Sequence, residues 1–408
     1  MSKTEWKEYE MSELIEEISM GPFGSNIKVE CFTDSGVPVL NGSNLVGFRL
    51  NEDSFNYVTE EKATSLGKAN AYRGDIVITH RGTLGQIVYI PQNSKYSQYV
   101  ISQSQFSVRC NEKVIPEYLV YYFHSRLGQH KLLSNASQVG VPSLARPTST
   151  FQKLTISIPP VAKQKEIVKI LSSLDDKIEL NNAINRNLEE QAQAIFKSWF
   201  VDFESFGGKM PEDWKLGKLG DVAEIKKKAF HPEKNPGLIV EHYSLPALDE
   251  KHYPVFEVAD GIKSNKFVVS KESVLISKLN PDTKRIWRPY CISENPICST
   301  EFVVFESING SHRDFLYSII DSQQFYDFMG SLVTGCTNSH QRVSPETLLT
   351  FPIAIPPKTI LKSFCDKITP IYEMIEKNVL ENQRLANLRD STLPKLMSGE
   401  IDSDKIAV

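Results

Sequence analysis

The side chains best suited to chemistry in this sequence lie in short polar segments between apolar runs. Amide and guanidinium groups match the donors and acceptors on base edges, and Lys and Arg also neutralise phosphates. Small residues at positions 21–26 would let backbone N–H groups approach a phosphate. We predict contacts with nucleic acid for Ser25, Asn26, Asn41, Asn44, His80, Arg81, Thr83, Gln138, Arg146, Lys226, Lys227, Lys278, Asn280, Lys284, Arg285, Arg288, Asn338, His340, Gln341 and Arg342. The alternative is that each segment is an ordinary solvated loop.

No pattern typical of catalysis or metal binding accompanies these segments. The sequence has no glycine-rich phosphate loop ending in Gly-Lys-Ser/Thr, no Asn/Asp-Pro-Pro-Tyr/Phe tetrapeptide and no glycine-rich methyl-donor motif. Pro211–Lys215 resembles a nuclease carboxylate–lysine cluster, but it lacks an upstream acid on an adjoining strand. Cys291 and Cys298 are too far apart for a zinc knuckle, and no two histidines have ligand spacing. We therefore predict a protein without a catalytic site, metal or cofactor of its own.

Composition excludes several other classes of protein. Of the 408 residues, 40% are hydrophobic and 24% are charged, which is typical of a globular protein. The net charge of −4 argues against a surface that coats nucleic acid throughout, yet it is compatible with a local basic face. No apolar run is long enough to cross a bilayer, and the first residues are polar and acidic, unlike a signal peptide. Six scattered cysteines without a CxxC pair favour the cytoplasm.

An internal repeat sets the domain organisation. Ile158-Pro159-Pro160 and Ile355-Pro356-Pro357 are 197 positions apart, and the same offset relates Tyr118-Leu119 to Phe315-Leu316. Short β-branched runs separated by turn residues predict a mixed α/β (α+β) domain in each copy. A continuous helix is expected in each domain, at residues 116–133 and 312–329. The predicted division is a globular domain at 1–160, a helix at 161–204, a second globular domain at 205–357 and a second helix at 358–408.

The two long helical segments each carry a heptad pattern that calls for a partner helix. Asn181 and Asn185 occupy the middle of the first pattern, and Asn378 and Asn382 occupy the same positions in the second. Buried Asn residues fix coiled-coil register when they pair. We predict an antiparallel pair with Asn181 and Asn185 facing Asn382 and Asn378. The alternative is that each helix packs on its own domain with these residues exposed. Pro370 predicts either a kink or the true start of the second helix.

An antiparallel pair would act as a spacer between two similar globular domains. About 35 helical residues span roughly 50 Å, and DNA presents equivalent grooves every ~34 Å, so such a protein could read two separated half-sites. The first helix also ends in an apolar cluster too wide for one helix contact, which predicts a partner-binding surface. Its members are Ile195, Phe196, Trp199 and Phe200.

The order of these features resembles the specificity (S) subunit of type I restriction–modification enzymes over essentially the whole chain. The resemblance is carried by Gly21-Pro22-Phe23-Gly24-Ser25, by Gly74–Thr79 and by Ser299–Val304. It continues in the first long helix, with Leu174-Asp175-Asp176-Lys177-Ile178 and Ile195–Phe203, and in the second with Leu393–Ile401. One departure is Leu361, which stands where the first helix has Gln164.

The resemblance implies two target recognition domains that each read half of a bipartite, asymmetric DNA sequence. It also implies that the helix pair docks two modification (M) subunits, which bind S-adenosylmethionine and methylate adenine. Two restriction (R) subunits, which use ATP and Mg, are further expected partners, and the S subunit itself has no chemistry. Two alternatives remain from the residues alone. One is a self-contained DNA methyltransferase or nuclease, and the other is a coiled-coil scaffold that does not bind DNA.

Overall fold

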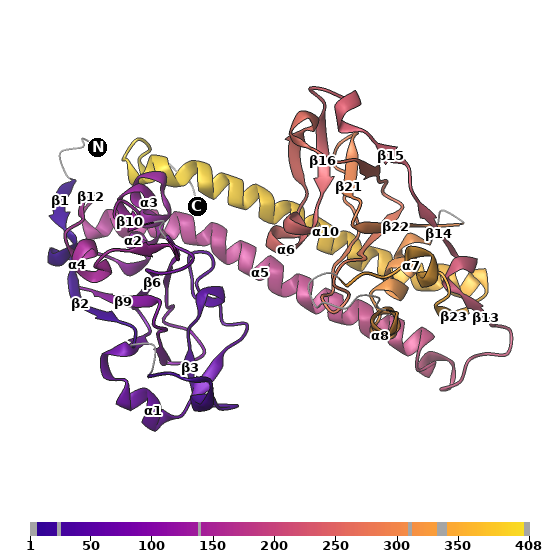
Figure 1. Ribbon diagram of the computed structural model, residues 1–408, viewed down its shortest axis with the longest axis horizontal. Coiled ribbons are helices and arrows are strands. Elements are labelled where there is room, and N and C mark those ends of the chain that lie inside the picture. The colour runs from indigo at the N-terminus through magenta and orange to yellow at the C-terminus, as the bar shows by residue number, and fades with distance from the viewer. Residues whose placement is uncertain (1–5, 23–25, 138–139, 309–311, 333–340, 404–408) are drawn as a thin grey trace. The chain divides into compact units, whose positions relative to one another are not determined.

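The computed structural model describes residues 6–22, 26–137, 140–308, 312–332 and 341–403. The chain forms two compact units. Unit 1 comprises Met1–Asp176 with Leu385–Val408, and unit 2 comprises Lys177–Arg384. Both boundaries fall inside the long helices α5 (Val161–Phe200) and α10 (Lys358–Met397). Each unit therefore contains a globular part beside a stretch of both helices (Figure 1).

Unit 1 contains two four-stranded sheets. The first is antiparallel, in the order β2-β9-β6-β7, and the second has the order β4-β3-β8-β5 with β3 and β8 parallel. The strands are β1 (Lys7–Glu10), β2 (Ile15–Met20), β3 (Val37–Val39), β4 (Asn56–Val58), β5 (Asn70–Tyr72), β6 (Ile76–Thr79), β7 (Ile87–Tyr89), β8 (Gln98–Val100), β9 (Gln105–Cys110), β10 (Ala136–Ser137), β11 (Ser143–Leu144) and β12 (Thr155–Ile158). The helices are α1 (Glu60–Ser65), α2 (Pro116–His124), α3 (Arg126–Leu132) and α4 (Pro147–Gln152).

Unit 2 repeats this plan. Its four-stranded sheet has the order β14-β22-β19-β20, and its second sheet has five strands in the order β15-β18-β21-β16-β17. The strands are β13 (Lys215–Lys218), β14 (Ala223–Lys226), β15 (Ala229–Phe230), β16 (Ile239–Tyr243), β17 (Val255–Val258), β18 (Lys266–Val268), β19 (Ser273–Ser277), β20 (Ile286–Trp287), β21 (Pro296–Ser299), β22 (Phe302–Ser307) and β23 (Pro352–Ile355). The helices are α6 (Leu245–Lys251), α7 (Arg313–Ile320), α8 (Gln323–Ser331) and α9 (Pro345–Leu348). Mixed α/β architecture is thus present in both units.

Each central strand is buried on both faces, which explains its unbroken apolar sequence. In β6, Ile76 and Ile78 join the core formed with α2 and the long helices, and Val77 joins the core shared with the second sheet. In β19, Ile276 and Leu275 divide in the same way between two cores. Full burial of one such side chain is worth about 1.5–3 kcal/mol. The two cores fix the position of the loops at the strand ends.

The prediction of one continuous helix at 116–133 and another at 312–329 is wrong, because each of these stretches contains two helices. Ser125 separates α2 from α3, and Ser322 separates α7 from α8. Both serines have extended backbones and accept a hydrogen bond from a backbone N–H three residues on, so each caps a new helix. The apolar pattern continues across each break, and for that reason it did not reveal the second helix.

The long helices pack together and not separately. Ile167 and Leu171 of α5 share the unit 1 core with Leu393 and Leu396 of α10. Helix α10 begins at Lys358 and runs through Pro370, so Pro370 does not mark its start. Within the described ranges, no helix is both long and apolar enough to span a membrane.

Candidate nucleic-acid interface

The polar loops of unit 1 meet at one end of its first sheet. Strands β2 and β6 end there, and β7 and β9 begin there. Backbone hydrogen bonds join the loops, from the N–H of Gly21 to the carbonyl of Gln105 (2.9 Å), and from the N–H of His80 to that of Ser104 (2.8 Å). The N–H of Leu144 then donates to the carbonyl of His80 (2.8 Å). This arrangement, which we call the loop junction, holds several polar segments in one place.

Gly21 is required for this close packing. A Cβ atom at this position would lie 1.8 Å from the carbonyl oxygen of Ser102, which belongs to backbone and cannot rotate away. The side chain of Gln105 is buried and accepts a hydrogen bond from the N–H of Ser102 (2.9 Å). This bond holds in place the Ser102 backbone that Gly21 packs against. The loop junction of unit 1 is therefore built by specific residues.

Several residues predicted to contact nucleic acid lie at or beside this junction. Asn26, Arg81, Thr83 and Arg146 are exposed. His80 is half-buried, and a ring nitrogen lies 3.1 Å from the carbonyl oxygen of Gln103. Burial lowers the pKa of His80, and the charge of Arg81 lowers it further, so this environment favours the neutral ring. A neutral imidazole has one donor and one acceptor, and it offers no charge to a phosphate.

Asn44 is a structural residue and not an exposed contact, which corrects its predicted role. Its side chain is 1% exposed and donates to the carbonyls of Asn51 and Ser54, both at 3.0 Å. Asn41 caps the same turn by accepting from the N–H of Ser43 (2.8 Å), and it remains exposed. The turn touches the junction through Gln86, whose side chain donates to the carbonyl of Gly42 (3.0 Å).

Unit 2 builds an equivalent junction from different residues. The N–H of Lys278 donates to the carbonyl of Glu301 (3.0 Å), and the N–H of Val343 donates to that of Lys278 (3.2 Å). These are the counterparts of the two bonds made by His80 in unit 1. The N–H of Asn280 donates to the carbonyl of Gln341 (3.0 Å), which adds a second bond between the segments that contain Lys278 and Val343. The repeat therefore extends from sequence to the hydrogen bonds that bring the loops together.

Most predicted basic residues of unit 2 are paired with carboxylates of the same unit. Arg285 binds both oxygens of Asp249, at 2.7 and 2.8 Å. The other pairs are Lys226–Glu224 (2.7 Å), Lys227–Glu346 (2.5 Å), Lys284–Asp321 (2.5 Å) and Arg342–Glu301 (3.0 Å). Exposed ion pairs contribute little to stability, so a phosphate can compete with these carboxylates. The basic residues could be predicted from the sequence, but the acidic residues that pair with them could not.

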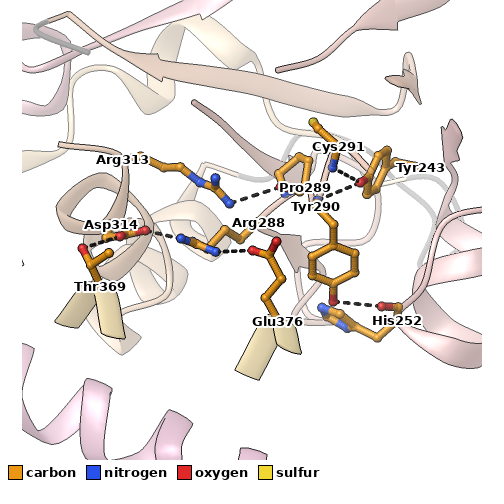
Figure 2. Close-up of polar contacts among 10 residues, drawn as sticks. All are labelled: Tyr243, His252, Arg288, Pro289, Tyr290, Cys291, Arg313, Asp314, Thr369 and Glu376. Atoms are coloured by element: carbon orange, nitrogen blue, oxygen red, sulfur yellow. Dashed lines mark hydrogen bonds and ion pairs between the residues drawn. The ribbon is translucent and has the colours of Figure 1, made fainter. Parts of the chain in front are cut away.

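The structure does not place Arg288 among the exposed loop cations where its predicted DNA contact requires it to be. Its side chain is 12% exposed and lies between Asp314 of α7 and Glu376 of α10, each at 2.8 Å (Figure 2). Thr369 donates to the second oxygen of Asp314 (2.7 Å). Arg288 therefore joins the globular part of unit 2 to α10.

A matching polar connection lies in unit 1. Arg389 of α10 binds Asp175 of α5 (2.6 Å), and the hydroxyl of Tyr121 in α2 donates to the same carboxylate (2.5 Å). No role was predicted for Tyr121, Asp175 or Arg389 from the sequence. The signal was present, because Arg389 is a charged residue at an apolar position of the heptad pattern.

The four asparagines of the helix pair lie together within unit 2. Asn181 donates to Asn382 (2.8 Å), and Asn378 donates to Asn185 (2.8 Å). Asn181, Asn185 and Asn378 are all less than 10% exposed. The helices are therefore antiparallel here, and the alternative with exposed asparagines does not hold.

The apolar cluster at the end of α5 is not an exposed partner surface. Phe196 and Phe200 are 7% and 8% exposed and pack against Trp214, Phe315 and Phe364 of the same unit. Ile195 and Trp199 are half-buried against this core. The cluster is wide because it packs against both α10 and the globular part, and this corrects the predicted role.

Some predicted residues lie outside the described ranges, namely Ser25, Gln138, Asn338 and His340. Among the residues that are described, no group of His, Cys, Asp and Glu side chains could hold a metal ion.

The chain thus consists of two repeated mixed α/β units, each of which gathers loops at one end of a sheet and packs against a stretch of the paired long helices. The family model described as "Type I restriction modification DNA specificity domain" matches residues 3–190 and 211–387, so the chain belongs to that family. It is a DNA specificity subunit of a type I restriction–modification system, which is a non-catalytic subunit with DNA-binding target recognition domains.

Named relatives span most of this chain. It is 24% identical to the specificity subunit of the type I restriction enzyme MjaIX of Methanocaldococcus jannaschii, with 86% of this chain and 82% of the relative covered. It is 23% identical to the HindI specificity subunit of Haemophilus influenzae, with 81% and 87% covered. The crystal structure of an S subunit from M. genitalium has a similar fold, with a TM-score of 0.57, 14% identity and 96% of each chain covered.

Proposed function

We propose that each unit reads one half of a bipartite, asymmetric DNA target through its own loop junction. The observation that carries this proposal is the recurrence of the same backbone connections, around His80 in unit 1 and around Lys278 in unit 2. Different side chains on equivalent junctions would read different bases, since sequence is read by the groups that reach base edges. The two halves of the target would therefore differ.

The helix pair, in this proposal, sets the spacing between the half-sites and docks two modification subunits. Buried Asn pairs and the Asp175–Arg389 and Arg288–Glu376 ion pairs support a rigid connection between globular parts and helices. The modification subunits supply S-adenosylmethionine, and two restriction subunits that use ATP and Mg complete the assembly. The complex acts on DNA in the cytoplasm. The functional segments would be 1–160, 161–204, 205–357 and 358–408.

Substitution of one residue at each junction tests the proposal. Arg81→Ala and Lys278→Ala remove exposed or half-buried cations that have no ion pair among the described residues. If either side chain contacts a base, its loss should cost about 1–3 kcal/mol of binding energy and relax preference at one position. Binding of the chain with its modification subunit to a library of DNA duplexes measures this for both variants.

Each substitution should affect only one half of the target. A relaxed position in both halves, after a change at a single junction, would contradict independent reading. Uniform weakening across all sequences, with a smaller salt dependence, would instead assign the residue to a phosphate contact.

A further inference from the structure

A pocket beside α10 in unit 2 gathers cations that have no counter-ion. It has a volume of about 420 Å³, and its basic side chains include Lys271, Arg313, Lys377 and Arg384, which we call the basic pocket. None of these four makes an ion pair within the part of the chain that the structure describes. This contrasts with the loop cations Lys226, Lys227, Lys284, Arg285 and Arg342, which are all paired.

The acids around the pocket do not balance these charges. Glu376 is bound to Arg288 (2.8 Å), and Glu381 accepts from Asn181 (2.8 Å) and lies 3.6 Å from Lys177. Glu373 also lines the pocket, whose lining, with Arg288 counted, holds five cations against three carboxylates. Lys377 is one helical turn from both Glu373 and Glu381 but within ion-pair distance of neither. The pocket therefore has a local excess of positive charge in a protein whose net charge is negative.

Arg313 is the most constrained member of the pocket. Figure 2 shows its guanidinium turned toward Pro289, whose carbonyl accepts from Nη2 at 3.2 Å. Its Nε is buried without a hydrogen-bond partner among the described residues. Burial, together with the nearby Arg288, lowers the pKa of Arg313 to about 10. A buried guanidinium donor without an acceptor is costly, and an anion in the pocket would remove that cost.

We propose that the basic pocket binds a phosphate of the DNA backbone, in addition to the contacts at the loop junctions. This inference rests on the proposed function, because it takes DNA as the ligand. Four unpaired cations exceed what one carboxylate of a partner protein can neutralise. Duplex DNA carries one charge per ~1.7 Å of its axis, so it can neutralise several cations at once. Guanidinium groups also match phosphate geometry.

The pocket contributes affinity without sequence preference. Phosphate contacts fix the position of a protein on the duplex and are the same for every base sequence. Each contact releases counter-ions, so it adds about 0.9 to the slope of log affinity against log salt.

The test compares two Arg→Gln variants of the full chain. Arg384→Gln removes an exposed cation of the pocket, and Arg186→Gln removes an exposed cation from α5 outside the pocket. Affinity for a 30-bp duplex of random sequence is measured at several KCl concentrations, and thermal melting verifies that both variants fold. We expect Arg384→Gln to reduce the salt slope by about one unit and to weaken binding at low salt by about tenfold. Arg186→Gln should match the unaltered chain.

Each other outcome has a defined meaning. An unchanged salt slope for Arg384→Gln would overturn the proposal. If Arg384→Gln weakens binding to the modification subunit but not to DNA, the pocket binds a carboxylate of that protein instead. A reduced slope, in a chain that shows no sequence preference even with its modification subunit, would support the pocket and contradict the proposed function. Absence of any DNA binding by the unaltered chain at low salt would overturn the proposal for the pocket, whereas the proposed function is judged by binding in the presence of the modification subunit.

Discussion

Arg288 shows how a residue that looks suited to DNA can serve the fold. It is buried between two carboxylates from different helices, and removal of one partner from such a group leaves an uncompensated charge. Arg288→Met should therefore lower the free energy of unfolding of unit 2 by about 3–5 kcal/mol. Urea unfolding followed by tryptophan fluorescence measures the loss, since Trp287 is the adjacent residue and is fully buried.

Lys227→Met is the matched control, because it breaks an exposed ion pair of the same unit. It should leave the unfolding midpoint nearly unchanged. Equal midpoints for Arg288→Met and Lys227→Met would contradict the structural role assigned to Arg288.

For single residues, the sequence indicated which loop side chains have donors, acceptors or charges suited to DNA, but it did not indicate which of them are paired or buried in the fold. Asn, Arg and Lys in the loops were found because their chemistry is specific to the residue. Their partners were not found, because ion pairs such as Lys227–Glu346 and Arg285–Asp249 join residues that only the fold brings together. Arg288 and Asn44 differ from their neighbours in the loops because they are buried. Burial could not be predicted for them, because loop sequences have no periodic apolar pattern that would indicate it.

Among the elements, the helix pair makes the sharpest prediction. Asn185→Leu alone leaves the amide of Asn378 buried without its acceptor, which should cost about 1–3 kcal/mol. Replacing both Asn185 and Asn378 by Leu should recover much of that loss, because no polar group is then left unpaired. Urea unfolding of the two single variants and the double variant gives the coupling between them.

Asn187→Leu, at an exposed position of the same helix, controls for the residue change itself. Additive costs for Asn185→Leu and Asn378→Leu would mean that the two side chains are not coupled.

The long helices were predictable because heptad periodicity is a repeated signal, and their central asparagines indicated an antiparallel pair. Shorter elements were less predictable. The break between α2 and α3 depends on one capping residue, Ser125, within a continuous apolar pattern. Ser322 has the same role between α7 and α8 in unit 2. The width of the cluster around Phe200 was detected, but the pattern could not show that Trp214 and Phe315 cover it.

For the whole molecule, the repeat predicted two related units, and the structure adds that each has its own loop junction. Bases cannot be assigned from loop sequences, since a side chain's partner depends on the local position of the duplex. What the repeat does predict is independence. Each junction is held by bonds within one unit, so a change in one should leave the other's preference intact.

Exchange of one globular domain tests this independence most directly. Residues 205–357 are replaced by the equivalent domain of a relative that methylates a different motif, and the methylome of cells carrying the chimera is sequenced. We expect a methylated motif in which one half is new, the other half is unchanged and the spacing is kept. A motif altered in both halves, produced by a chimera that still supports methylation, would contradict two independent reading units.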